Sequence, residues 1–278
     1  MCKTATINKI IPMSLVDGPG NRTAIFFQGC NFNCSYCHNP ETIKKCINCG
    51  VCVSHCPVGA LKMIDGKVIW DENKCIDCDT CIKVCPHGST PKTHKYTVDD
   101  LMEKIEENIP FIEGITTSGG ECTLNFEFLE ELFIKVKSLG LTSLVDTNGF
   151  ISLKKPIMDG LVKAADGFML DIKSMDEDEH IKLTGRSNKN VIENAVYLAS
   201  IGKLQEIRTV LIEGHKNRET VENITKLLKP YPNLTYKLIS YRPFGVREEF
   251  LELKSIGQKE KEELKEIVIA NGIKVIDC

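Results

Sequence analysis

An internal repeat of eight cysteines constrains the fold of this 278-residue chain more than any other sequence feature. Each half of the repeat reads C-x2-C-x2-C-x3-C-P, and the second half lies 29 residues after the first. The two sets are Cys46, Cys49, Cys52 and Cys56, and Cys75, Cys78, Cys81 and Cys85. Four coincident spacings and a shared proline indicate a duplicated unit. We therefore expect residues 44–93 to form a small domain of their own.

The spacing within each half is typical of bacterial proteins that bind two [4Fe–4S] clusters. In such runs, three neighbouring cysteines hold three corners of one cluster, and the fourth cysteine belongs to the other cluster. The expected ligand sets therefore cross between the halves: Cys46, Cys49, Cys52 and Cys85 for one cluster, and Cys75, Cys78, Cys81 and Cys56 for the other. Two structural zinc sites, each with four thiolates, are the alternative. The region resembles two-cluster ferredoxins over about 45 residues.

Three further cysteines form a shorter group with the spacing C-x3-C-x2-C. Cys30, Cys34 and Cys37 offer three thiolates to a [4Fe–4S] cluster, which would leave one iron open to an outside ligand. A zinc site completed by His38 is the alternative, although His38 directly follows Cys37 and would have to turn back onto the same metal. The other cysteines are expected to be spare thiols, with Cys122 buried: Cys2, Cys122 and Cys278.

Outside the cysteine-rich region, short apolar runs alternate with amphipathic segments. The runs predict strands at residues 22–28, 114–117, 141–146, 167–172, 207–212, 236–240 and 273–276. The amphipathic segments predict helices at residues 98–108, 126–139, 189–201 and 219–228. An apolar stripe predicts one more helix near the end, at Leu264, Ile267 and Val268.

Alternating strands and helices indicate an α/β fold with a parallel sheet. About six such units favour a partial (β/α)6 TIM-like barrel, formed here by residues 1–43 and 94–278. A bacterial-type two-[4Fe–4S] ferredoxin domain at residues 44–93 would be inserted into it, with a hairpin turn at Asp65-Gly66. In such barrels the active site lies at the carboxyl ends of the strands, and the three-cysteine group directly follows the first predicted strand.

Composition and charge exclude several classes of function. Hydrophobic residues make up 42% and charged residues 26% of the chain, as in folded globular proteins. A formal net charge of −3 gives no reason to expect a nucleic-acid partner. The apolar runs are far shorter than the roughly 20 residues of a membrane span, and residues 10–13 are too few for a signal peptide. We therefore expect a cytoplasmic protein with reduced, metal-binding cysteines, and a monomer is the simplest expectation.

Residues 30–37 (CNFNCSYC) resemble the C-x3-C-x-aromatic-C signature of radical S-adenosylmethionine enzymes. Residues 16–22 (VDGPGNR) resemble the N-terminal signature of the enzymes that activate glycyl radical enzymes. Matches continue in the family's order with residues 118–121 (SGGE), 146–149 (DTNG) and 169–173 (MLDIK), so the resemblance covers nearly the whole chain. The cysteine-rich insert marks the branch with extra clusters, and the pattern is most similar to the YjjW-type members.

The resemblance implies roles in binding S-adenosyl-L-methionine. Tyr36 and the backbone around Cys37 and His38 would contact the adenine. Gly119 and Gly120 would let the backbone approach the methionine end, where Glu121 would accept a hydrogen bond from the ammonium group.

The later motifs would complete this site. Asp171, Ile172 and Lys173 would line the ribose and carboxylate regions. In the pyruvate formate-lyase activase a monovalent cation lies beside S-adenosylmethionine, and its ligands match Asp146, Thr147, Met169 and Asp171. This chain departs from that activase at Ser240-Tyr241-Arg242, where the activase has a histidine after a Pro-Tyr pair. Arg242 is expected to contact the ligand in its place.

The family's chemistry implies reductive cleavage of S-adenosyl-L-methionine to methionine and a 5′-deoxyadenosyl radical, which removes a hydrogen from a glycine of a partner enzyme. Cys30, Cys34 and Cys37 would hold the catalytic cluster. The two insert clusters would carry electrons from a flavodoxin or ferredoxin-type donor, and all three would be oxygen-sensitive. Two alternatives remain open: a radical enzyme that acts on a small molecule, and an iron–sulfur electron carrier without catalysis.

Overall fold

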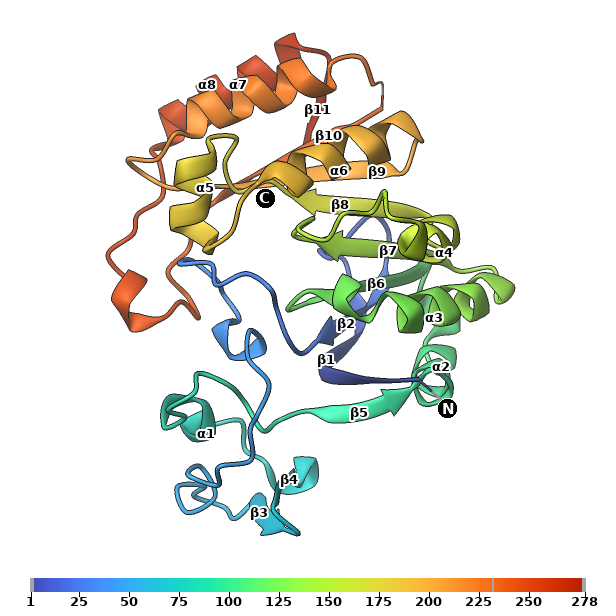
Figure 1. The fold of residues 1–278 in the computed structure, drawn as a ribbon, viewed down its shortest axis with the longest axis vertical. Helices are drawn as coiled ribbons and strands as arrows, with labels where there is room; N and C mark the ends of the chain where they lie inside the picture. Colours follow the sequence, from blue (N-terminus) through green and yellow to red (C-terminus); the bar gives the residue numbers. More distant parts are fainter. Residues whose placement is uncertain (1–2, 232, 277–278) are drawn as a thin grey trace.

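A curved sheet of nine strands forms the centre of the protein, in the order β11-β10-β9-β8-β7-β6-β2-β1-β5 (Figure 1). The structure is a computed structural model and describes residues 3–231 and 233–276. A separate sheet, β3-β4, lies at the lower end of the view. The strands are β1 (Thr4–Ser14), β2 (Arg22–Phe27), β3 (Leu61–Ile64), β4 (Lys67–Trp70), β5 (His94–Thr97), β6 (Gly114–Gly119), β7 (Thr142–Thr147), β8 (Gly167–Asp171), β9 (Leu204–Leu211), β10 (Thr235–Ser240) and β11 (Lys274–Ile276).

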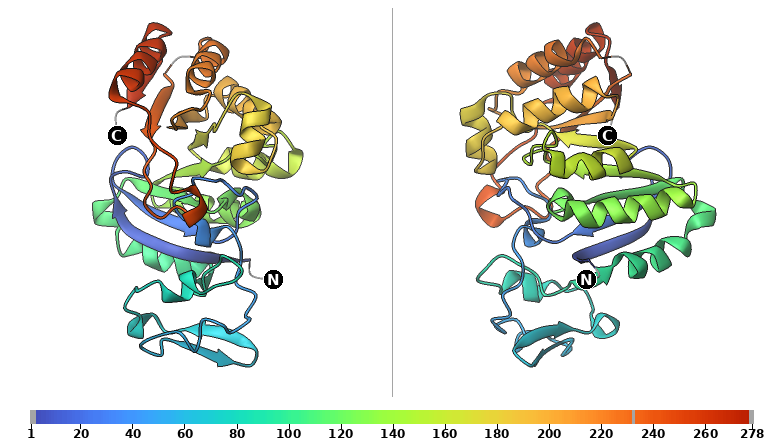
Figure 2. Two further views of the ribbon diagram at one scale, coloured as in Figure 1. Left: turned by 90° about the vertical axis from the view of Figure 1, so that its left-hand side faces the viewer. Right: turned by 45° about the vertical axis from the view of Figure 1, so that its right-hand side comes forward.

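The strands from β2 through β6 to β11 pair in parallel, whereas β1 pairs antiparallel with both β2 and β5. Parallel neighbours require crossover helices, which here lie mainly over the outer face of the curved sheet (Figures 1 and 2). The helices are α1 (Thr80–Lys83), α2 (Val98–Glu106), α3 (Phe126–Ser138), α4 (Asp159–Ala164), α5 (Glu177–Thr184), α6 (Lys189–Ser200), α7 (Asn217–Leu228) and α8 (Gln258–Ala270). The predicted α/β class with a mostly parallel sheet is confirmed.

The main core lies between this sheet and its helical layer. In α3, Leu129, Leu132, Phe133 and Val136 recur every three or four residues and are completely buried. They pack in one apolar cluster with strand residues such as Ile115. Burial of a side chain of this size stabilises the fold by about 1.5–3 kcal/mol. The sheet edge that carries the site is therefore anchored in a large apolar interior.

The structure contains five helices and strands that the sequence does not predict: β1, β5, α1, α4 and α5. β1 is half exposed and includes Pro12, so its apolar alternation is weak. In α5 the first turn is entirely acidic, at Glu177, Asp178 and Glu179, and the helix has no clear apolar stripe. Such short elements are held by pairing and packing with neighbours that the local sequence does not reveal.

The segment between β2 and β5 adds no strand to the large sheet within the part of the chain that is described. Its β3-β4 hairpin turns at Asp65 and Gly66, which have φ of +48° and +72°, so the predicted hairpin is confirmed. Its own small apolar cluster contains Cys52, Leu61 and Cys81. Trp70 stacks on His94 of β5 at a ring-centroid distance of 4.9 Å, which attaches the segment to the edge of the large sheet.

None of the helices in the described ranges combines the length and the apolar character that crossing a membrane requires.

Candidate active site

The carboxyl ends of β2, β6, β7 and β8 meet at one edge of the sheet, because neighbouring strands run in parallel. Three of the sequence motifs and the three-cysteine loop, residues 30–37, follow these strand ends. The fourth motif, at residues 16–22, lies at the opposite edge, where β2 begins. There the buried Arg22 donates to the carbonyl oxygens of Ile115 (2.7 Å) and Thr142 (3.0 Å) and joins the amino ends of β6 and β7.

The three-cysteine loop is held by backbone hydrogen bonds on both sides. The Cys30 N–H donates to the Ile43 carbonyl at 2.9 Å. The N–H groups of Asn33 and Ser35 donate to carbonyl oxygens at the end of α5, each at 2.9 Å. Burial raises the pKa of the Cys30 thiol to about 12 and that of Cys34 to about 11. Burial also raises the pKa of Cys37.

The loop also contains polar atoms that suit a bound ligand. The Tyr36 hydroxyl, the Ser35 hydroxyl and the Asn31 amide nitrogen are buried and make no hydrogen bond within the described residues. Buried polar groups in native proteins are nearly always hydrogen-bonded. The donor set therefore fits a group that binds at this loop, with three thiols close by.

Gly119 and Gly120 are required by the backbone of β2 and of the residues after it. A Cβ at Gly119, where φ is +104°, would lie 2.4 Å from the Phe27 nitrogen, and one at Gly120 would lie 2.2 Å from the Gly29 carbonyl oxygen. The sequence motif predicts instead that these glycines allow close approach of a ligand. The structure supplies a different reason, because here the carboxyl ends of β2 and β6 approach each other too closely for any side chain.

Glu121 is buried beneath the site and accepts four hydrogen bonds. One oxygen accepts from the N–H and hydroxyl of Thr123 and from the Thr147 hydroxyl, and the other accepts from the Asn148 N–H. Its carboxylate therefore joins the ends of β6 and β7. Both oxygens therefore already have partners within the protein. The expected contact of Glu121 with the ammonium group of a ligand stays a prediction.

Asp146 at the end of β7 accepts from the Ser118 hydroxyl at 2.8 Å and pairs with Arg208 of β9 at 3.0 Å. The Arg208 guanidinium also approaches the Met169 sulfur at 3.1 Å and pairs with Glu206. It thus contacts two of the four residues expected to hold a monovalent cation, and that cation stays a prediction. The sequence reading missed Arg208 because it belongs to none of the recognised motifs; a charged residue in an apolar strand was the available signal.

Lys173 lies beside the three-cysteine loop. Its ammonium pairs with Asp171 at 2.5 Å and lies 5.6 Å from the centre of the Tyr36 ring. Burial opposes its charge, but Asp171, Tyr36 and Cys34 together outweigh burial and raise the pKa of Lys173 well above its usual range. The Ile172 side chain points into the core, and its backbone N–H and carbonyl bond to β9. Ile172 therefore fixes the strand end from which Asp171 and Lys173 extend.

His38 and Arg242, both expected to contact the ligand, lie next to each other and interact through the backbone of Arg242. The Arg242 carbonyl oxygen lies 2.9 Å from Nε2 of His38. Burial lowers the pKa of His38. The Asn148 amide, another group that the sequence reading missed, donates to Asn31 at 2.8 Å and lies 3.7 Å from the Cys30 sulfur.

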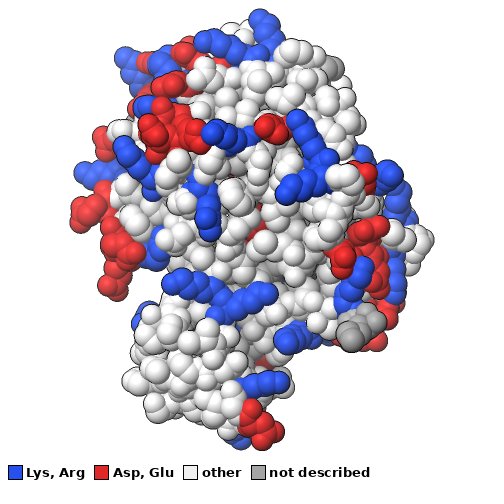
Figure 3. Space-filling model, viewed as in Figure 1, with Lys and Arg blue, Asp and Glu red and all other residues white. Residues whose placement is uncertain are grey.

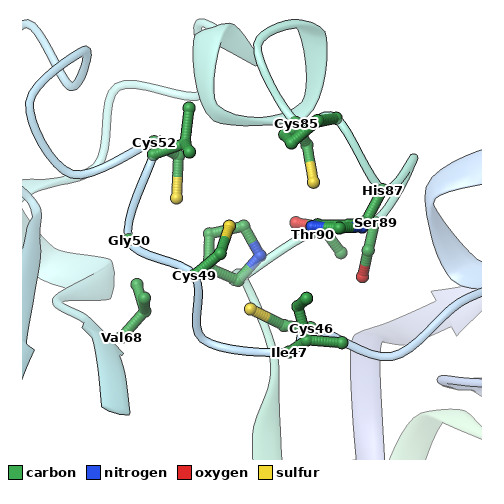
Figure 4. A pocket seen from close by; sticks show the side chains of 13 residues that line it. Cys46, Ile47, Cys49, Gly50, Cys52, Val68, Cys85, His87, Ser89 and Thr90 are labelled. Atoms are coloured by element: carbon green, nitrogen blue, oxygen red, sulfur yellow. The ribbon is translucent and has the colours of Figure 1, made fainter. Parts of the chain in front are cut away.

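The eight repeat cysteines line two hollows in the insert, and the two sets cross between the halves of the repeat. The first hollow, of about 320 Å³, is lined by Cys46, Cys49, Cys52 and Cys85. Figure 4 shows the four sulfur atoms directed toward a common space. The second hollow, of about 330 Å³, is lined by Cys56, Cys75, Cys78 and Cys81. Both volumes include space open to solvent.

These hollows are wider than a site for one ion. Across the described ranges, no three His, Cys, Asp or Glu side chains lie close enough together to surround a single metal ion. The assignment of a metal group to either hollow remains a proposal and is made below.

Cys122 is completely buried, and its thiol approaches the carbonyl oxygens of Thr117 (3.5 Å) and Asp146 (3.4 Å), so it is a packing residue as expected. Cys2 and Cys278, predicted to be spare thiols, lie outside the described residues.

Comparisons with known proteins identify the family of the chain. Residues 24–228 match the Radical SAM superfamily. The chain is 34% identical to the trans-4-hydroxy-L-proline dehydratase activating enzyme of Clostridioides difficile, over 93% of this chain and 94% of that protein. It is 31% identical to the choline trimethylamine-lyase activating enzyme of Oleidesulfovibrio alaskensis, over 88% of this chain and 86% of that protein.

A solved structure supports the fold alone. The crystal structure of a domain of pyruvate-formate lyase-activating enzyme from Bacteroides vulgatus matches with a TM-score of 0.51 and 21% identity, covering 59% of this chain and 98% of that one. The superfamily match extends over the sheet edge and its three-cysteine loop, and the two relatives are covered over 94% and 86% of their own lengths. The chain belongs to the radical SAM superfamily and, within it, to the activating enzymes of glycyl radical enzymes.

Proposed function

We propose that this chain activates a partner glycyl radical enzyme by removing one hydrogen atom from a glycine of that partner. Cys30, Cys34 and Cys37 would hold a [4Fe–4S] cluster, and this cluster, once reduced by one electron, would supply the reductive cleavage of S-adenosyl-L-methionine to methionine and the 5′-deoxyadenosyl radical that takes this hydrogen. The observation that carries the proposal is the meeting of three thiols, Lys173 and Asp171 at one sheet edge.

The chain's own residues would bind and orient the ligand, and they would exclude water from it. Three thiolates are one fewer than a cubane has irons, so an amino and a carboxylate group from the ligand can bind the open iron. Lys173, held by Asp171, provides a fixed positive charge for the ligand's carboxylate. The apolar cluster of Tyr36, Leu183, Ile212, Tyr241 and Val246 excludes water from one side of the loop.

We propose a partial (β/α)6 barrel at residues 1–43 and 94–278, and a ferredoxin-like insert at 44–93. The crossed cysteine sets at the two hollows support one [4Fe–4S] cluster in each, because this crossing is typical of two-cluster ferredoxins. These clusters would pass electrons from a flavodoxin or ferredoxin-type donor to the three-cysteine loop. A cytoplasmic monomer is the simplest form that agrees with this role.

The test is anaerobic reconstitution with iron and sulfide, followed by reduction in the presence of S-adenosyl-L-methionine. We expect about 12 irons per chain, four for each of three clusters, with little zinc. We also expect 5′-deoxyadenosine, and its absence would overturn the enzymatic function. Adding a candidate glycyl radical enzyme should give a glycyl radical signal by electron paramagnetic resonance. Turnover of a small molecule without any such partner would favour the small-molecule alternative instead.

A further inference from the structure

The segment after β10 lies against the three-cysteine loop, although more than 200 residues separate them in the chain. Figure 1 shows this orange-red segment, which includes the short helix Glu248–Phe250, beside the blue loop. The Arg242 carbonyl contacts the ring of His38, and Gly245 packs on the His38 backbone. A Cβ at Gly245, where φ is +76°, would lie 2.4 Å from the His38 carbonyl oxygen. The fit of the two backbones here therefore depends on glycine.

Arg247 of this segment contacts the middle of the loop with both terminal nitrogens. Nη1 donates to the Asn33 side-chain oxygen at 2.8 Å. Nη2 donates to the Cys34 carbonyl at 3.0 Å and approaches the Asn33 carbonyl at 3.4 Å. The guanidinium also lies 4.9 Å from the centre of the Phe250 ring, and 25% of the side chain is exposed. One planar group thus binds three acceptors, which a lysine ammonium cannot reach in the same geometry.

The loop's donors and acceptors are held by different parts of the fold. Its N–H groups at Asn33 and Ser35 donate to the end of α5, whereas its carbonyl groups accept from arginine side chains. Arg186 holds the Asn31 carbonyl with a single nitrogen at 3.2 Å and is exposed. Arg247 binds the residue that carries one of the three thiols, so its contact bears most directly on how the cysteines are spaced.

We propose that Arg247 is a positioning residue that fixes the backbone at Asn33 and Cys34, so that Cys30, Cys34 and Cys37 keep the spacing a cluster needs. The proposal rests on the proposed function, because it takes the loop to be the cluster site. Arg247 acts through the loop and does not touch the reacting atoms. Groups that orient metal ligands from behind typically contribute 10–100-fold to metal affinity.

The test compares Arg247→Met, Arg247→Lys and the control Arg218→Met. Arg218 pairs with Glu263 on the exposed surface of α7 and α8, far in the chain from the loop. Each reconstituted protein is treated with an iron chelator, and the release of the most labile four or so irons per chain is followed. The spectrum of the reduced loop cluster with S-adenosyl-L-methionine is recorded by electron paramagnetic resonance. Amide hydrogen exchange of residues 30–37 is measured in the metal-free proteins.

We expect Arg247→Met to release loop iron about tenfold faster than wild type, with an altered spectrum and faster exchange in the loop. Arg247→Lys should behave more like Arg247→Met than like wild type, because it keeps the charge but loses the planar fork. Arg218→Met should match wild type in all three measurements.

Three outcomes would overturn the inference. The first two are wild-type iron release, spectrum and exchange in Arg247→Met, and full recovery of all three by Arg247→Lys, which would show that charge alone matters. A lower thermal stability with an unchanged spectrum and unchanged loop exchange would also overturn it, since the role would then be merely structural. If wild-type protein binds no cluster at the loop, the proposed function fails, while hydrogen exchange still tests Arg247 in the metal-free protein.

Discussion

The sheet-edge site and the insert assemble their cysteines in opposite ways. At the sheet edge, the loop is held by the nearby Ile43 and by residues from distant parts of the chain: the end of α5, Asn148 and Arg247. In the insert, each hollow takes its four cysteines from within a 40-residue stretch, positions 46–85. The first arrangement depends on the whole fold, and the second depends on a local repeat.

The two regions also differ in what stabilises them. The large sheet shares one extended core with its helices, whereas three buried residues, Cys52, Leu61 and Cys81, form the centre of the insert's own cluster. Seven large apolar side chains of the insert are strongly exposed: Ile47, Val51, Val58, Met63, Ile64, Ile69 and Ile76. In the view of Figure 3 the insert also carries fewer charged side chains than the body. Small domains with so little core usually need metals or disulfides to fold.

The largest difference is expected between cysteine substitutions in the two regions. Cys37→Ala should abolish 5′-deoxyadenosine formation, by about 10³-fold or more, because a cluster with two thiolates is not retained in an active form. Cys49→Ala should remove about four irons but leave activity when a chemical reductant supplies the electrons. The measurement is iron content and 5′-deoxyadenosine yield under dithionite. An equal loss of 5′-deoxyadenosine yield in both variants would contradict the assignment of catalysis to the loop and of electron transfer to the insert.

Removal of iron should unfold the insert and leave the large sheet folded. A small domain that is stabilised by its clusters loses this stabilisation when the metal is removed, whereas the large sheet is stabilised by its own apolar core. Trp70, the single tryptophan, lines the second hollow and reports on the insert by fluorescence. We expect chelation to shift its emission to longer wavelength and to expose residues 44–93 to protease, with helical circular dichroism largely kept. Protease cleavage distributed evenly along the chain would argue against two independent levels of stability.

Much of both regions could be predicted from the sequence because their signals are local. The repeat spacing gave the crossed cysteine sets, and strand periodicity gave the sheet edge that carries the three-cysteine loop. The partners of that loop could not be predicted in the same way. Arg208 and Arg247 act across long chain separations; Arg208 stands out only as a charged residue within a predicted strand, and nothing in the residues around Arg247 marks it as different from a surface arginine. Only the fold brings them to the site.

In the metal-free protein, a thiol of the insert should react at least about tenfold faster than a thiol of the three-cysteine loop. Burial raises the pKa of Cys30 to about 12, whereas Cys78 is exposed and belongs to the insert, which is expected to unfold without iron. Thiolate is the reactive form, so at pH 8 Cys78 should be alkylated much faster than Cys30. Mass spectrometry after brief iodoacetamide treatment measures both rates.

The raised pKa of Cys30 also determines how the stability of the metal-free protein changes with pH. Because the pKa of Cys30 is raised in the folded state, its protonated thiol contributes fully to the stability of the fold below the ordinary thiol pKa of 9.0. This contribution is lost as the pH rises toward about 12. Metal-free protein should therefore lose stability over this range, and Cys30→Ala should lose less. Equal alkylation rates of Cys30 and Cys78 at pH 8 would show that the loop is not ordered without its cluster.

The smallest expected effect concerns two glycines with the same backbone conformation and open space around them. Gly140 after α3 has a φ of +76°, and Gly66 in the β3-β4 turn has a φ of +72°. An alanine at such a φ costs about 1 kcal/mol in either place. Gly140→Ala should therefore lower the free energy of unfolding of the sheet by that amount, measured by urea denaturation. Gly66→Ala should leave Trp70 fluorescence and iron content of the loaded protein unchanged, because binding of a structural metal contributes on the order of 10 kcal/mol and outweighs the strain. If Gly66→Ala instead lowers the free energy of iron binding by as much as Gly140→Ala lowers the free energy of unfolding of the sheet, packing of the polypeptide stabilises the insert, and its clusters do not.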